Sequence, residues 1–417
     1  MRDSREGGAE GAAVGGLAGQ VPLLLITFWI GFNLRAAILG VPPVLSVVRA
    51  DLHLTYTEVG LLSGLPILAF AAAALPASAL VRRWGGYLVV ALGLAVAVAG
   101  ELLRVVPGGV LPLFFGTALM GTGIALTQPG MPALFQRWFR GRVQTASVTL
   151  TLGITIGELV SASVSRPVLY AGLRSWQGTM VVWGLFGVSC LLVWLLGVPR
   201  LRVGLSEGSA WELGSLFGSR DLWAVYICFG GQSLVFFAAN TWIPGSVQGG
   251  PHSALASLSL AVLNGAMVPV DVGLILVRRP FATSRWFYVV SGLVMLAGSA
   301  GWLWFGHQLP LLFAALMGIG VAMNFAGLLA YPALVAGPGR VATMSAVMLT
   351  VGYSCAFCGP LLGGVAIDLG GGASSPFIPI AVAAAIMVVA ATQVGPHLSP
   401  RVSGRALGGQ LVDSGER

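Results

Sequence analysis

Long apolar stretches alternate with short polar segments along most of the chain. Windows of about 19 residues pick out twelve apolar stretches, each about as long as a helix that crosses the hydrocarbon core of a bilayer. Their approximate limits are 20–46, 57–81, 86–104, 110–136, 143–166, 176–198, 221–246, 254–277, 286–306, 309–335, 341–367 and 376–395. The pattern predicts an all-α integral membrane protein with twelve transmembrane helices.

The apolar stretches form two groups of six that repeat each other in sequence. LVRR at 80–83 returns at 276–279, ALMGTGIA at 118–125 returns as ALMGIGVA at 315–322, and GRVQTASVTLTLG at 141–153 returns as GRVATMSAVMLTVG at 339–352. Three matches in order, at nearly constant offset, indicate a duplicated six-helix unit. A site between two such halves is typical of secondary transporters.

The repeat and the polar segments together predict the domain organisation and its orientation. If the N-terminus is cytoplasmic, the cytoplasmic segments hold 17 arginines and the outer segments hold 4. This asymmetry indicates that both termini are cytoplasmic. We expect the protein to lie in the plasma membrane. The predicted units are a cytoplasmic tail 1–19, a six-helix bundle 20–198, a cytoplasmic loop 199–220, a six-helix bundle 221–396 and a cytoplasmic tail 397–417.

Composition excludes several kinds of activity. The chain is 56% hydrophobic and 9% charged, and its 22 basic residues are all arginine. Without lysine there is no P-loop of the Gly-Lys-Ser/Thr type and no lysine Schiff base. The histidines fall in loops or at the ends of apolar stretches, and the arginines are spread over short loops. We therefore expect no enzyme activity, cofactor, metal site or nucleic-acid partner, and an intramembrane enzyme or sensor is the least favoured alternative.

Several motifs resemble the major facilitator superfamily, and within it the cyanate-permease (cyanate and nitroimidazole transporter) subfamily. They are Asn33-Leu34-Arg35, LTYTEVGLLSGLPIL at 54–68, QPGMPALFQRWF at 128–139, GGQSLVFFAANTWIP at 230–244 and SAVMLTVGYSCAFCGPLLGG at 345–364. The resemblance covers about residues 20–395. It implies alternating access, a central cavity lined by the first, fourth, seventh and tenth helices, and a monomer.

Charged residues inside the apolar stretches are candidates for function. Arg35 lies near the middle of the first stretch, where a cation costs ~2.5–3.5 kcal/mol on insertion scales, and its guanidinium suits a small flat anion. Glu158 has a similar depth and is a candidate partner of Arg35, proton-coupling residue, or both. A fixed structural bridge between them is the alternative. Asp271 is a second candidate for proton coupling or for a gate. Glu101 and Asp368 are expected near the outer ends, as solvated or gate residues.

Neutral polar residues within the apolar stretches are candidates for substrate binding. Uncharged amides need partners in hydrocarbon, and single hydrogen bonds between helices would also satisfy them. The set comprises Asn33, Gln128, Gln232, Asn240, Asn264, Asn324 and Tyr353, and Trp242 is added as an aromatic surface for substrate, with core packing as the alternative.

These observations predict a secondary active transporter of a small polar or anionic solute. The resemblance makes the solute cyanate-like, and coupling to protons through Glu158 is one option. Its partners would be that solute, the lipid bilayer and protons. A multidrug or small-molecule efflux carrier of the same fold is the alternative.

Overall fold

A computed structural model describes residues 17–139, 143–198, 220–247, 253–276, 281–335 and 341–394. In these ranges the chain is helical in each of the twelve predicted stretches, and ten helical segments are long and apolar enough to cross a membrane. The all-helical membrane fold is thereby confirmed. Residues 199–219 of the predicted loop 199–220, residues 1–16 of the predicted tail 1–19 and the whole predicted tail 397–417 lie outside the described residues.

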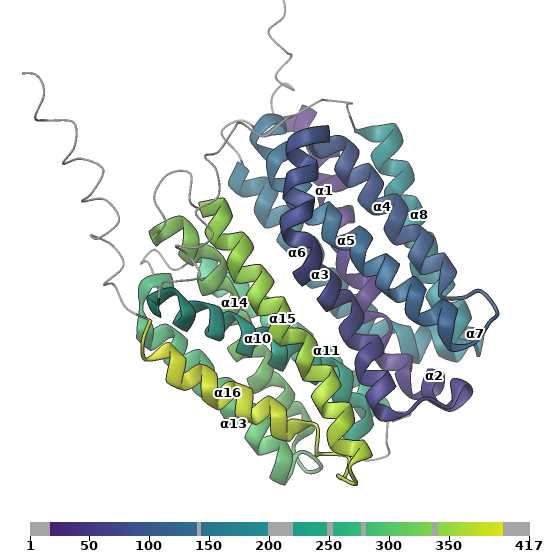
Figure 1. Cartoon of the computed structure of the whole chain (residues 1–417), viewed down its shortest axis with the longest axis vertical. Coiled ribbons are helices and arrows are strands. Elements are labelled where there is room, and N and C mark those ends of the chain that lie inside the picture. The colour runs from purple at the N-terminus through teal and green to yellow at the C-terminus, as the bar shows by residue number, and fades with distance from the viewer. Residues whose placement is uncertain are drawn as a thin grey trace, which may run out of the picture.

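The described helices form two groups that lie side by side (Figure 1). The first half comprises α1 (Leu17–Leu39), η1 (Pro42–Val44), α2 (Leu45–Leu52), α3 (Tyr56–Trp84), α4 (Gly86–Leu103), α5 (Val110–Trp138), α6 (Val143–Val164), η2 (Ser165–Tyr170), α7 (Ala171–Leu173) and α8 (Trp176–Gly197). The second half comprises α10 (Arg220–Ser246), α11 (Ala254–Gly265), α12 (Met267–Leu276), η4 (Phe281–Thr283), α13 (Arg285–Phe305), α14 (Pro310–Val335), α15 (Val341–Asp368) and α16 (Phe377–Ala391).

The halves meet along helices that come early in one half and late in the other. α3 packs on α15 and α6 packs on α11, and Figure 1 shows α11 and α15 on the side of the second half that faces the first. The start of α3 and the end of α15 lie at the same side of the membrane. The arginine distribution predicts that this side is the outer one, and we call it the predicted outer side.

Two predicted stretches are interrupted at prolines. The stretch 20–46 is not one helix, because α1 ends at Leu39 and a short 3-10 turn begins at Pro42. The stretch 254–277 is divided at Ala266 into α11 and α12, with Pro269 in the first turn of α12. Proline has no backbone N–H to donate, so it is tolerated in a first turn but not within a helix without cost.

The sequence repeat corresponds to repeated helix contacts. A Cβ added to Gly123 of α5 would meet the backbone of Ala97 in α4, and one added to Gly320 of α14 would meet the backbone of Ser291 in α13. Small residues at such positions allow membrane helices to approach closely. The equivalent glycines therefore pack equivalent pairs of helices in the two halves.

Candidate functional site

The site is built where α1 and α6 approach most closely. A Cβ on Gly153 of α6 would meet the carbonyl of Phe28, and one on Gly157 would meet the carbonyl of Phe32. Their spacing of four residues places both glycines on one face of α6, the small-xxx-small pattern of tightly packed membrane helices. This contact draws the backbones of α1 and α6 together just beside Glu158.

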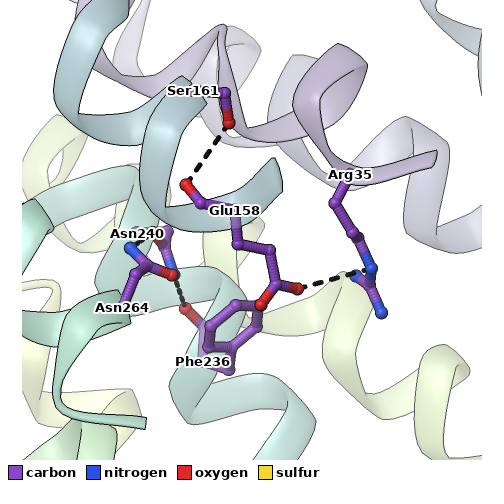
Figure 2. Close-up of polar contacts among 6 residues, drawn as sticks. All are labelled: Arg35, Glu158, Ser161, Phe236, Asn240 and Asn264. Carbon is purple, nitrogen blue, oxygen red and sulfur yellow. Dashed lines mark hydrogen bonds and ion pairs between the residues drawn. The ribbon is translucent and has the colours of Figure 1, made fainter. Parts of the chain in front are cut away.

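Arg35 of α1 and Glu158 of α6 form a buried ion pair (Figure 2). Arg35 Nε lies 3.4 Å from Glu158 Oε1, and the two residues are 6% and 4% exposed. A bidentate arginine–carboxylate pair would have two shorter contacts. Here the contact is single and long, and Arg35 Nη1 is buried with no hydrogen-bond partner. The guanidinium therefore keeps donors that could bind a further acceptor.

An aromatic residue of the second half, Phe237, lies beside the Arg35 guanidinium. The Cζ atom of Arg35 lies 5.5 Å from the ring centroid of Phe237 in α10, within the range of a cation–π contact. Tyr353 of α15 lies 6.5 Å from Phe237 between ring centroids and 5.3 Å from Phe70 of α3. Arg35 thus lies at the boundary between the halves. Phe237 was not among the residues predicted from the sequence, and Tyr353 was.

Two of the predicted amides form a pair on the second half. Asn264 Nδ2 donates to Asn240 Oδ1 at 2.9 Å, and Asn240 Nδ2 donates to the carbonyl of Phe236 at 3.0 Å. Both residues are almost fully buried, and Asn264 Oδ1 has no partner. In the view of Figure 2 the amide pair and Arg35 lie on opposite sides of Glu158.

Comparison with known proteins gives the site its context. A family model described as Major Facilitator Superfamily matches residues 23–360. The chain belongs to this superfamily. It is therefore a multi-pass membrane transporter that binds small molecules, and it is not an enzyme.

Relatives and solved structures agree with the superfamily assignment. The chain is similar to the 2-nitroimidazole transporter of Escherichia coli (strain K12), at 30% identity over 89% of this chain and 95% of that one. It is also similar to the cyanate transport protein CynX of the same organism, at 25% identity over 84% of this chain and 91% of that one. A bacterial homologue of the human lysosomal transporter Spinster, in an inward-facing and occupied conformation, has the same fold with a TM-score of 0.74 at 14% identity, covering 91% of this chain and 97% of that one.

Other predicted residues of this transporter lie away from the Arg35–Glu158 pair. Asn324 donates to Ser291 Oγ at 3.1 Å within the second half, and Gln232 accepts from its neighbour Ser233 at 3.2 Å. Asn33 is buried on α1, but its spacing of two from Arg35 places it on another face of the helix.

Gln128 and Trp242, two further residues predicted to bind substrate, also lie away from the Arg35–Glu158 pair. Gln128 is half-buried on α5. Trp242 donates its Nε1–H to the carbonyl of Pro360 at 3.1 Å, and its ring lies 6.3 Å from that of Tyr56. The tryptophan therefore joins α10, α15 and α3 near the predicted outer side.

The remaining carboxylates of the transporter have three different environments. Asp271 is half-buried on α12. Glu101 was expected in contact with water and is instead fully buried. The reason is that Gly187 of α8 leaves the space against α4 that the Glu101 carboxylate occupies. Its position near a helix end did not reveal that it points into the bundle.

Asp368 joins the two halves of the transporter at the predicted outer side. Asp368 is the last residue of α15. Its carboxylate accepts hydrogen bonds from the backbone N–H of Tyr56 at 3.2 Å, from the backbone N–H of Thr57 at 2.7 Å and from Thr57 Oγ1 at 2.6 Å. The first N–H groups of a helix have no partner within it, and its N-terminus favours negative charge. Asp368 therefore fastens the start of α3 to the end of α15.

Proposed function

We propose that this transporter moves a small anion or small polar solute of the cyanate kind by alternating access, with Arg35 as the binding group. One observation carries the proposal: Arg35 is buried at the boundary of the halves, and its one long contact with Glu158 leaves Nη1 without a partner. An ionisable residue at this depth in the membrane costs free energy, and such residues usually have a function.

The chemistry of the guanidinium favours a small acceptor. Arginine is always charged and offers planar donors that fit carboxylate-like anions. A buried charge needs a counter-charge and hydrogen bonds, and Glu158 supplies these only through a single contact of 3.4 Å. A small anion that accepted from Nη1 would improve the pairing of Arg35 and compete with Glu158 for it.

Competition for Arg35 would couple the anion to a proton. When the anion takes the guanidinium, Glu158 loses its counter-charge in a buried position, and burial favours the neutral carboxyl group. Anion and proton would then cross together without net charge, whereas uptake of the anion alone is opposed by about 2.3 kcal/mol per 100 mV.

The names of the relatives support the size of the proposed cargo. One relative is a 2-nitroimidazole transporter and another a cyanate transport protein, and both of those solutes are small and polar. The pairing of Arg35 with Phe237 suits a flat solute, since the cation lies over an aromatic ring on which a flat solute can stack. Efflux of bulky or cationic compounds is the outcome that would contradict the proposal.

Replacing Glu158 by glutamine should remove the pH dependence of transport. Radiolabelled cyanate uptake into proteoliposomes is measured with an imposed pH gradient and, separately, an imposed membrane potential. The wild type should respond to the pH gradient and little to the potential. Glu158→Gln should lose the pH response and become sensitive to the potential, because the anion then crosses without its proton.

A matched variant tests the choice of carboxylate. Asp271→Asn should keep the pH response of the wild type. If Asp271→Asn loses that response while Glu158→Gln keeps it, the proton site is Asp271 and the competition mechanism is wrong.

Removing the Asp368 carboxylate should open the predicted outer side. Asp368→Ala deletes three hydrogen bonds between the halves, and loss of comparable helix-capping bonds costs about 0.5–2 kcal/mol. The equilibrium should shift severalfold towards a larger separation of the halves. Double electron–electron resonance between spin labels at Val106 and Leu369, in a chain whose own cysteines are replaced by serine, measures this separation.

Asp51→Ala is the matched control for Asp368→Ala. Asp51 is also exposed and accepts a hydrogen bond, from Trp176 Nε1 at 2.8 Å, but both residues belong to the first half. Its removal should leave the distance distribution unchanged. Equal distributions for wild type and Asp368→Ala would show that the carboxylate does not hold the halves together.

A further inference from the structure

A small cavity lies between the halves, between Arg35 and the predicted outer side. Its volume is about 20 Å³, and its lining includes Ser63 of α3, Arg104 at the end of α4, Thr117 of α5, and Phe237 and Thr241 of α10. A cavity of this size holds about one water molecule. Most of its lining is apolar, and its polar side chains are those of Ser63, Arg104, Thr117 and Thr241. It belongs to neither half alone, so its size would change if the halves moved.

Two polar groups in the cavity lining lack partners. Arg104 is 2% exposed. Its Nη2 donates to the carbonyl of Ala37 at 3.4 Å, while its Nε has no partner. The hydroxyl of Ser63 is also buried without a partner. A buried donor without an acceptor costs about 1–3 kcal/mol, so an acceptor in the cavity would satisfy both groups.

The Arg104 charge is not neutralised by direct contact. Glu101, one helical turn earlier on α4, acts on it electrostatically, but both carboxylate oxygens of Glu101 are buried without hydrogen-bond partners. Glu101 occupies the space left by Gly187 of α8, whereas Arg104 reaches towards α1 and the cavity. The Arg104 guanidinium therefore lies beside the cavity, and its Nε–H has no acceptor.

Phe237 separates this cavity from Arg35. The ring lies 5.5 Å from Arg35 Cζ and also lines the cavity. Ile38 and Leu39, which follow Arg35 by about one helical turn, line the cavity as well. An anion that left Arg35 towards the predicted outer side would therefore pass Phe237 and enter the space beside Arg104.

We propose that the cavity is a second binding site for a small anion, in which Arg104 and Ser63 hold the solute between Arg35 and the outer surface. The inference rests on the proposed function of the transporter. In the present conformation the cavity is too small for more than a water-sized guest, so the site is filled as the halves separate on this side. A solute from outside would bind at this site first and would then pass Phe237 to reach Arg35.

Cyanate exchange across proteoliposomes tests the site. Arg104→Gln and Ser63→Ala should each raise the KM on the predicted outer side, Arg104→Gln by about ten- to a hundredfold, while the Kd for cyanate at Arg35, measured on the purified protein, stays within about twofold. Arg174→Gln, which changes an exposed arginine on the same side, should behave as the wild type. Wild-type KM in Arg104→Gln and Ser63→Ala would overturn the proposal.

A double variant separates binding from charge balance. If Arg104 served only to offset Glu101, then Glu101→Gln/Arg104→Gln would restore the outer KM. The proposal expects the double variant to keep the high KM of Arg104→Gln, because the anion donors are still missing. Restoration would overturn it.

A readout without cargo distinguishes failure of this site from failure of the proposed function. In Ser63→Cys, an anionic methanethiosulfonate applied outside should react faster than a cationic one, and adding Arg104→Gln should abolish this preference. The same chain without the Ser63 change gives the background rate. If this preference holds but no small anion is transported, the proposed cargo is wrong and the cavity site stands. If cyanate is transported through Arg35 but Ser63→Cys reacts without charge preference, or not at all, the cavity site is wrong.

Discussion

Arg35→Gln abolishes the transport of small anions while the protein still folds and inserts. The guanidinium is the buried cation at the boundary of the halves, and it holds donors that Glu158 does not use. Losing one partner of a buried charge interaction weakens binding by about 2–5 kcal/mol, so transport in proteoliposomes at low cyanate concentration should fall by about thirtyfold to a few thousandfold. Glu158, left without its counter-charge, is expected to take up a proton rather than unfold the protein.

The double variant Arg35→Gln/Glu158→Gln distinguishes a binding group from a fixed bridge. It removes both charges and leaves no unpaired buried ion. If Arg35 only balances Glu158, the double variant should recover both thermal stability and transport. We expect recovery of stability with transport still absent, and recovered transport would mean that Arg35 has a structural role.

Gly157→Ala disrupts the assembly of the site. The added methyl group would meet the carbonyl of Phe32 in α1, so α1 and α6 must separate next to Glu158. Overpacking of this kind costs about 1–3 kcal/mol. The variant should melt at a lower temperature in detergent, and the part that folds should bind anions more weakly because the pairing of Arg35 and Glu158 is disturbed.

Gly273→Ala is the matched control, because it makes the same change in another membrane helix. A Cβ at Gly273 of α12 would have nothing within 4 Å, and alanine favours a helix over glycine by about 0.5–1 kcal/mol. This variant should be as stable as the wild type or more so. Equal stability of Gly157→Ala and Gly273→Ala would show that close packing of α1 and α6 does not support the site.

The helices and the central charges could be predicted from the sequence, because both follow from the cost of polar groups in hydrocarbon. Apolar length located the spans, and Arg35 and Glu158 were recognisable as charges that no lipid-facing position tolerates. Their pairing could not be derived from depth alone. Gly153-x-x-x-Gly157 was present as a signal for the α1–α6 contact, although only the structure shows which helix it meets.

Positions that depend on the rotation of a helix were harder to predict. Phe236 and Phe237 are adjacent, and the ring over which the Arg35 guanidinium lies is that of Phe237. Asn324 has the depth of a cavity residue but turns towards α13. Glu101 lies near a helix end and was expected in water, but it points into the bundle. Hydropathy gives the depth of a residue in the membrane and says little about which neighbour it faces when every face is apolar.

The most direct measurement of the central claim is thermal stabilisation of the purified transporter by a panel of solutes. The panel contains cyanate and other small anions, small neutral solutes, and bulky or cationic compounds, each at acidic and neutral pH. Wild type, Arg35→Gln and Arg174→Gln are compared, since a ligand that binds only the folded state raises its melting temperature by mass action. The account predicts that a small anion stabilises the wild type and Arg174→Gln but not Arg35→Gln. Stabilisation by bulky or cationic compounds alone, equal in all three proteins, would contradict it.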